Sequence, residues 1–106
     1  MLQWLMVVTP ARADMLITGP TPEELSTAGQ HFEYWKRLTE AGQALVVGRM
    51  QTTGPETMGI AIFLAENEDA ARKICQADPA VAGKVFDMRF APYKVALLGD
   101  TAPFKP

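Results

Sequence analysis

The stretch that decides the fold is residues 58–78, which reads MGIAIFLAENEDAARKICQAD. Its first part, to Ala65, has the length and the apolar, β-branched and aromatic content of a strand. Asn67 then caps a helix, and the acidic residues after it suit the positive end of the helix dipole. The helix must end close to Pro79, because a residue before proline avoids helical backbone. The stretch therefore predicts a strand followed directly by a capped helix.

Upstream, a strand is again followed by a helix. Residues 2–9 form a short apolar run that is typical of a strand. Thr21 and Glu24 then match a capping box, with proline at the first helical position between them. The helix is predicted to run to about Ala41, with Gly42 as its left-handed terminator.

The remaining elements complete a βαββαβ order. Residues 44–50 and 58–65 are the expected second and third strands, and residues 52–57 connect them as a hairpin. Residues 84–95 are expected to form a long final strand, whose far end Pro92 confines to a sheet edge or a bulge. Right-handed crossovers let both helices cover one face of a four-stranded sheet. The predicted class is therefore α+β, in the split βαβ or ferredoxin-like arrangement.

Length and charge exclude several classes of protein. With 106 residues we expect a single domain at 1–97, followed by a C-terminal tail at 98–106. The net charge is −2 and the basic residues are scattered, which disfavours nucleic-acid binding. The apolar N-terminal run lacks the basic segment of a signal peptide and is far shorter than the ~20 residues that cross a bilayer. We therefore expect a cytoplasmic protein with no nucleic-acid or membrane partner.

Two segments leave alternatives open. Residues 10–20 have the prolines and glycine of a loop but carry an apolar patch, which fits either a short helical turn or a flap folded over a cleft. Gly29 lies inside the first helix, where glycine costs about 1 kcal/mol relative to alanine. Close approach by another backbone or a ligand would explain it, and so would a helix break with a second start near Thr27.

The sheet is expected to be apolar on both faces. Two helices cover only one face, so the other face of a monomer should be polar. In the first strand, Trp4, Met6 and Val8 lie on one face and Leu5 and Val7 on the other. In the third strand, Ile60, Ile62 and Leu64 lie on one face and Ala61 and Phe63 on the other. An exposed apolar face favours a two-fold homodimer that pairs sheet against sheet. A lone domain with that face covered by the loop and the tail is the alternative.

His31 is the only histidine and the first candidate for chemistry. At about 100° per residue, it falls at the margin of the apolar stripe of its helix. An imidazole in that position can exchange protons near neutral pH. The stripe itself comprises Leu25, Ala28, Phe32, Trp35 and Leu38.

Asp78 is the second candidate, because the inward stripe of the second helix, after Ala71 and Ile74, finishes in this carboxylate. A buried carboxylate is costly unless it is hydrogen-bonded or paired. The fold sets the two helices side by side, so a hydrogen bond in which Asp78 orients His31 is sterically reasonable. Structural roles fit equally well: Asp78 can cap the turn before Pro79, and His31 can be an amphipathic residue at the helix margin.

Three further side chains are candidates for binding a substrate. Arg49 ends the second strand, where its guanidinium suits an anionic group. Arg89 lies on a strand face that can line a cleft at the dimer interface, and Tyr34 lies on the first helix, although ordinary packing explains each of them too. One histidine and one cysteine fall short of a metal-ligand set, so neither a metal nor a cofactor is expected. Cys75 is predicted to be a small buried apolar residue.

An ordered set of short motifs resembles the YCII-related family, over about residues 2–97. The motifs are His31 to Trp35, Val47 to Arg49, Asn67 to Ala71, Ala77 to Val81 and Arg89 to Tyr93. The resemblance implies a dimeric α+β barrel fold. It also implies a site built from a histidine on the first helix and an aspartate before proline, which are His31 and Asp78 here. One relative in the family resembles a dehydrochlorinase, and the wider superfamily includes muconolactone isomerases and small monooxygenases.

Two hypotheses on function follow. The first is a small cofactor-independent enzyme in which His31, oriented by Asp78, acts as general acid and base on a small carbonyl or phenolic substrate. The reaction would be an isomerisation or an elimination. The second is a non-catalytic, dimeric protein that binds an unidentified small molecule or serves as an accessory factor. The sequence alone does not separate the two.

Overall fold

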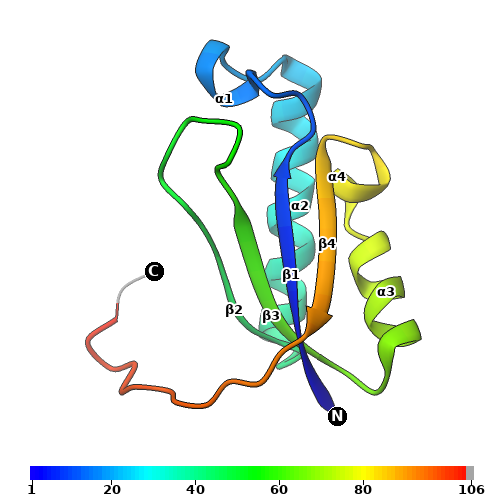
Figure 1. Cartoon of the computed structure of the whole chain (residues 1–106), viewed down its shortest axis with the longest axis vertical. Helices are drawn as coiled ribbons and strands as arrows, with labels where there is room; N and C mark the ends of the chain where they lie inside the picture. Colours follow the sequence, from blue (N-terminus) through cyan, green and yellow to red (C-terminus); the bar gives the residue numbers. More distant parts are fainter. Residues whose placement is uncertain (105–106) are drawn as a thin grey trace.

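The structure is a computed structural model that describes residues 1–104. Figure 1 shows the arrangement of the strands and helices in this part of the chain. Their bounds are β1 (Leu2–Pro10), α1 (Met15–Thr18), α2 (Pro22–Glu40), β2 (Ala44–Arg49), β3 (Gly59–Ala65), α3 (Glu68–Gln76), α4 (Pro79–Ala82) and β4 (Phe86–Pro92). None of the helices in residues 1–104 has the length and apolar character that crossing a bilayer requires.

The strands form one antiparallel sheet of four, in the order β2-β3-β1-β4. At the centre of the sheet, Met6 of β1 lies between Ala61 of β3 and Phe90 of β4. A β-bulge between Ala44 and Val46 shifts the register of β2 against β3. This strand order, with helices crossing between β1 and β2 and between β3 and β4, is the ferredoxin-like fold, so the predicted α+β class is confirmed.

The core lies between the sheet and the helices α2 and α3, which cover the same face (Figure 1). Alternation along the strands turns every second side chain towards these helices. The buried apolar side chains of this core are Trp4, Met6 and Val8 from β1, Ala44 from β2, Ala61, Phe63 and Ala65 from β3, Trp35 from α2, and Ala71 and Cys75 from α3. The predicted burial of Cys75 is therefore confirmed, and burial raises the pKa of its thiol to about 12.

Local chemistry fixes both ends of α2. The Thr21 side chain accepts a hydrogen bond from the Glu24 amide, and the Glu24 carboxylate accepts one from the Thr21 amide, which is the predicted capping box. At the other end Gly42 has a φ of 78°, a left-handed conformation that favours glycine. The helix is continuous through Gly29, so the alternative of a break near Thr27 is wrong.

Three other local expectations need correction. The strand β4 ends at Pro92 rather than at residue 95, because proline offers no amide hydrogen to the ladder. A short helix, α4, follows α3 and was not predicted. Leu25 and Phe32 were expected in the apolar stripe that packs on the sheet, yet both are exposed. A cavity separates this part of α2 from the sheet, so Phe32 lies at its edge rather than in the core.

The opposite face of the sheet carries no helix within residues 1–104 (Figure 1). We call it the open face. Its apolar side chains are only half-buried and comprise Leu5 and Val7 of β1 with Ile60, Ile62 and Leu64 of β3. The second apolar face that the sequence predicts is therefore present, while the homodimer stays a prediction. The predicted limit between domain and tail, after residue 97, also stays a prediction.

Gly29 offers a direct test of the helix energetics. A Cβ at this exposed position would meet no atom within 4 Å, so alanine fits without strain. We expect Gly29→Ala to raise the free energy of unfolding by about 0.5–1 kcal/mol, because alanine loses less backbone entropy on folding. Urea unfolding followed by circular dichroism measures the change.

The matched control is Gly42→Ala. The left-handed backbone at Gly42 costs a residue with a Cβ about 1–2 kcal/mol, so this variant should be destabilised. A loss of stability in Gly29→Ala as large as that of the control would contradict the continuous, unobstructed helix.

Candidate active site

Asp78 occupies the turn between α3 and α4 and is fully buried. It is the N-cap residue of α4, and its Oδ1 accepts a hydrogen bond from the amide of Ala80 at 2.9 Å. Pro79 follows it at the first helical position, where its missing amide hydrogen is no loss. The capping role that the sequence left open is therefore real, but it uses only one of the two carboxylate oxygens.

The other oxygen, Oδ2, contacts two side chains of α2. The Nε1 of Trp35 donates to it at 2.8 Å, and the Nδ1 of His31 lies 2.6 Å from it. These two residues are four apart in the helix and so share one of its faces. Because Trp35 and Ala80 both donate to the carboxylate, Asp78 acts as the acceptor and His31 donates through Nδ1. The predicted contact between His31 and Asp78 is thus present.

These contacts fix the orientation of the imidazole ring. The edge of the His31 ring meets Phe86 of β4 at a centroid distance of 5.1 Å and an interplanar angle of 89°. The side chain remains 19% exposed. With Nδ1 bound to Asp78, Nε2 is the nitrogen left to exchange a proton with a ligand.

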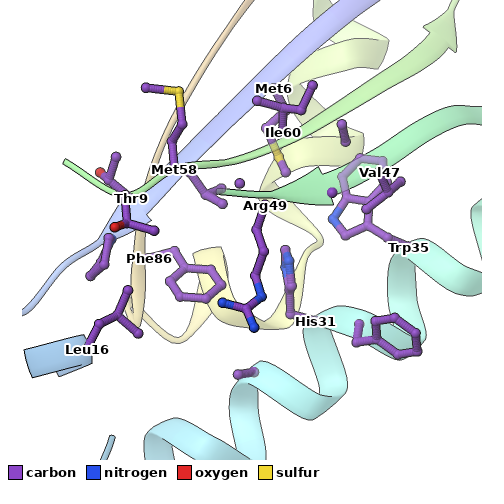
Figure 2. Close-up of a pocket in the computed structure, with 18 residues that line it drawn as sticks. Met6, Thr9, Leu16, His31, Trp35, Val47, Arg49, Met58, Ile60 and Phe86 are labelled. Atoms are coloured by element: carbon purple, nitrogen blue, oxygen red, sulfur yellow. The ribbon is translucent and has the colours of Figure 1, made fainter. Parts of the chain in front are cut away.

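A cavity of about 350 Å³ opens beside this ring (Figure 2). Its walls come from all four strands and α2, with Leu16 of α1 at one side. Most of the lining is apolar, and it includes Met6, Val8, Phe32, Met58, Ala61 and Phe86. The volume and lining are typical of a site for a small molecule. None of the described lining residues is a carboxylate.

Arg49 is the one arginine or lysine among the described residues that line the cavity. It lies at the end of β2, and Figure 2 shows its guanidinium extending towards His31 and Phe86. Within the part of the chain that the structure describes, Arg49 forms no ion pair. A guanidinium beside an apolar cavity without a carboxylate can bind an anionic oxygen of a ligand.

The segment between β1 and α2 closes one side of the cavity. Arg12 holds this segment in place through two hydrogen bonds to Glu24, from Nη2 at 2.7 Å and from Nε at 3.0 Å, and a third to the carbonyl of Gly19 at 3.0 Å. The residues expected to be a turn or a flap therefore form the short helix α1. Leu16 of this helix lines the cavity, so the segment is both a short helical turn and a cover over a cleft.

The paired guanidinium changes the acidity of Glu24. The hydrogen bonds from Arg12, and next the one from the Thr21 amide, lower the pKa of the Glu24 carboxyl to about 2. The deprotonated carboxylate is thus part of the structure that holds α1 beside the cavity.

Two of the predicted substrate-binding residues lie away from the cavity. The hydroxyl of Tyr34 donates to the carbonyl of Ile74 at 2.6 Å, and burial raises the pKa of this phenol to about 12. Arg89 lies opposite Val7 in the sheet, on the open face. The structure therefore brings His31, Asp78 and Arg49 together, but not Tyr34 or Arg89.

Trp35 is the residue whose part in the site the sequence did not reveal. We expected it to be packing alone, whereas its indole N–H is one of the donors to Asp78. A signal was available: a buried tryptophan needs a partner for its N–H, and Trp35 shares a helix face with His31. The apolar patch that contains Leu16 was expected in a turn or in a flap over a cleft, but nothing local indicated that Leu16 itself lines the cavity.

Comparisons with known proteins agree with the fold. Residues 3–94 match the YCII-related domain. No curated protein matches the sequence. Among solved structures, the chain is similar to a 5-chloro-2-hydroxyhydroquinone dehydrochlorinase from Burkholderia phenoliruptrix AC1100, in complex with 2,5-dihydroxybenzoquinone. The TM-score is 0.63 at 17% sequence identity, covering 86% of this chain and 93% of that one. At this identity the likeness shows the fold alone.

The Arg12–Glu24 pair predicts a specific pH dependence. A carboxyl whose pKa is lowered from 4.5 to about 2 stabilises the fold fully above pH 4.5, and this contribution is lost as the pH falls towards 2. Glu24→Gln removes it. We therefore expect the wild type to melt at a higher temperature than Glu24→Gln at pH 7, with the difference shrinking between pH 4.5 and pH 2.

Thermal melts of both proteins across that range measure the effect. The control is Glu23→Gln, which removes a carboxylate from the same first turn of α2 and leaves the pair of Arg12 with Glu24 intact. A Glu24→Gln difference that does not change between pH 7 and pH 2 would contradict the pairing.

Proposed function

This chain belongs to the YCII-related family, and from that premise we propose that it is a small enzyme that uses His31 as general acid and base. Asp78 orients the imidazole and stabilises its charged form. The substrate is a small carbonyl or phenolic compound, and the reaction is an isomerisation or an elimination. One observation carries the proposal: the 2.6 Å contact of His31 Nδ1 with buried Asp78 leaves Nε2 for a ligand in the apolar cavity.

The proposed proton transfer begins at a carbon–hydrogen bond beside a carbonyl group. Nε2 of His31 takes the proton, the electron pair of the broken carbon–hydrogen bond forms a double bond to the carbonyl carbon, and the π electrons of the carbonyl group move onto its oxygen. The positive charge of Arg49 stabilises that oxygen as it becomes anionic. Return of the proton to another carbon completes an isomerisation, whereas departure of an anion from the neighbouring carbon completes an elimination. Positioned acid–base catalysis of this kind contributes about 10²–10⁴-fold to the rate.

The surroundings of the dyad support this chemistry. The apolar lining strengthens the electrostatic interactions of His31, Asp78 and Arg49 with a bound ligand. Three hydrogen bonds hold the Asp78 carboxylate, so little reorganisation is needed when the ring becomes charged. Each of these steps uses side chains of this chain, and the proposal therefore includes no cofactor.

The proposal includes a homodimer built through the open face. A half-exposed apolar sheet face favours burial against an identical copy, since a two-fold axis pairs the same side chains on both subunits. We also propose that the protein works in the cytoplasm, which rests on the sequence alone.

The similar Burkholderia structure suggests a probe. That protein is named as a dehydrochlorinase and holds 2,5-dihydroxybenzoquinone, whose ring hydrogens lie beside carbonyl groups. If this chain binds the compound with a ring carbon near Nε2, the His31 ring should donate a solvent deuteron to that carbon as the neighbouring enol becomes a ketone. It should then take the original hydrogen from the same carbon as the enol forms again, which exchanges the ring hydrogen for deuterium. The alternative function, a dimeric binding or accessory protein, predicts binding of such a compound without exchange.

The experiment follows the ring hydrogens of 2,5-dihydroxybenzoquinone in D₂O by proton NMR. We expect the wild-type protein to accelerate their replacement by deuterium, and His31→Ala to remove about 10²–10⁴-fold of that acceleration. Asp78→Asn should lose part of it, because the amide supports a charged ring less well. Gln30→Ala, an exposed neighbour on α2 that does not line the cavity, is the control and should behave as the wild type.

Broadening of the ligand resonances reports binding in the same samples. Binding without accelerated exchange would favour the non-catalytic alternative. Acceleration that persists in His31→Ala would remove the histidine from the proposal.

A further inference from the structure

The cavity holds few polar groups, and these decide which ligand it can bind. Among its described lining residues, His31 and Arg49 carry the ionisable groups, and Thr9 and Thr57 carry hydroxyls. The hydroxyl of Thr57 is already hydrogen-bonded to that of Thr52. The rest of the lining consists of apolar or aromatic side chains and glycine. In such a site the few polar groups fix the orientation of a ligand. His31 and Arg49 are therefore the residues that select it.

The two residues require opposite things of a ligand. With Nδ1 donating to Asp78, Nε2 of the neutral His31 ring can only accept a proton. The guanidinium of Arg49 offers only N–H donors and no acceptor. Figure 2 shows this guanidinium extending towards the imidazole. A ligand must therefore present an acidic hydrogen to His31 and oxygen acceptors to Arg49, on neighbouring atoms.

The charges around the cavity set the charge of the ligand. Arg49 forms no ion pair within residues 1–104, and none of the described lining residues is a carboxylate. One negative charge on the ligand therefore balances the guanidinium. A dianion such as a phosphate monoester would leave a charge uncompensated in an apolar site, which is costly. The N-terminus of α2, which could otherwise bind phosphate, is occupied by its own cap of Thr21 and Glu24.

We propose that the substrate is a 2-oxo acid with an apolar side chain. The inference rests on the proposed function and names its substrate class. The guanidinium of Arg49 binds the carboxylate and also reaches the carbonyl oxygen, because the two groups stand on adjacent carbons. The carbon on the other side of the carbonyl group carries the hydrogen that Nε2 of His31 removes.

The double task of one guanidinium favours this class. Arg49 has to balance the charge of the bound substrate and to stabilise the oxygen that becomes anionic in the reaction. A simple ketone would leave the guanidinium without a counter-charge when it binds. A simple carboxylate has no neutral carbonyl group to accept the electrons. In a 2-oxo acid both groups share one fork of N–H donors.

The exposure of the lining residues gives the substrate a direction. Arg49 and Phe32 are exposed and mark the mouth of the cavity, whereas Met6, Val8 and Ala61 are buried and form its inner wall. The carboxylate thus stays close to water, and the apolar side chain points inwards. The volume of about 350 Å³ exceeds the roughly 150 Å³ of a cavity that holds one benzene, so a single ring on a short chain fits.

The proposed step is balanced by the substrate and His31 alone. Nε2 takes a proton from the carbon beside the carbonyl group. The electron pair of that bond forms a double bond to the carbonyl carbon, and the π electrons move onto the carbonyl oxygen, where Arg49 stabilises the enolate. The ring exchanges its proton with solvent and returns one to the same carbon, which regenerates the 2-oxo acid with a solvent hydrogen. Return of the proton to the oxygen gives the enol.

The test compares two compounds with the same phenyl side chain. One is 2-oxo-4-phenylbutanoate, and the other is the ketone 4-phenylbutan-2-one, in which a methyl group replaces the carboxylate. Proton NMR in D₂O follows the hydrogens of the CH₂ group beside the carbonyl group in each compound. Each rate is divided by the rate with free imidazole at the same concentration, because the two compounds differ in intrinsic acidity.

We expect the wild-type protein to accelerate the exchange of the 2-oxo acid about 10–100-fold more than that of the ketone, because hydrogen bonds to charged groups contribute this much. Equal acceleration of the two compounds, or a greater acceleration of the ketone, would overturn the proposal. This comparison uses the wild type alone, so it does not depend on how a variant folds.

The variant Arg49→Gln removes the charge at the mouth of the cavity. Its preference for the 2-oxo acid over the ketone should disappear, since the guanidinium is what distinguishes them. The control is Arg37→Gln, at an exposed position on α2 that does not line the cavity, and it should keep the preference. A preference that survives in Arg49→Gln would overturn the assignment.

Exchange in 2,5-dihydroxybenzoquinone separates this proposal from the proposed function. If that exchange depends on His31 while the 2-oxo acid shows no preference over the ketone, the substrate class is wrong and the proposed function stands. If the protein accelerates exchange in none of the three compounds, both are wrong.

Discussion

The buried carboxylate of Asp78 is the constraint on which the site depends. Charge removed from water is costly, and here it is compensated by three donors, from His31, Trp35 and the Ala80 amide. His31 and Trp35 lie on α2, between β1 and β2, and the Ala80 amide lies on α4, between β3 and β4. Because all three donate to one carboxylate, they hold these two connections against each other. Loss of the carboxylate would leave those donors unpaired in the interior, which costs about 1–3 kcal/mol for each.

The same bonds determine what the histidine can do. A ring anchored at Nδ1 presents Nε2 to the cavity, whose apolar walls arise because the N-terminal half of α2 stands away from the sheet. The exposure of Phe32 and the cavity thus have one cause. The short helix α1 fills part of the remaining gap, and its position depends on the pairing of Arg12 with Glu24.

Much of the fold could be predicted from the sequence because its signals are local. The alternation along β1 and β3, the capping box at Thr21 and the left-handed Gly42 each act within a few residues. The contact of His31 with Asp78 was also accessible, since two crossover helices on one sheet face leave few places for a lone imidazole and a buried carboxylate.

What could not be predicted depends on distances that no local pattern encodes. The gap under α2 follows from how far the helix stands from the sheet, and so does the choice of Leu16, among residues 10–20, as the side chain that lines the cavity. The positions of Tyr34 and Arg89 could not be predicted for the same reason, although each is close to a site residue in the sequence. Tyr34 contacts α3 through the carbonyl of Ile74, and Arg89 lies on the open face of the sheet.

The most direct measurement of the central contact is nitrogen–proton NMR of the His31 ring in ¹⁵N-labelled protein without ligand. A single histidine makes the assignment unambiguous. At a pH where the ring is neutral, we expect its proton on Nδ1, protected from exchange with water by the bond to Asp78. A neutral ring with its proton on Nε2, or one that exchanges as fast as free imidazole, would contradict the arrangement.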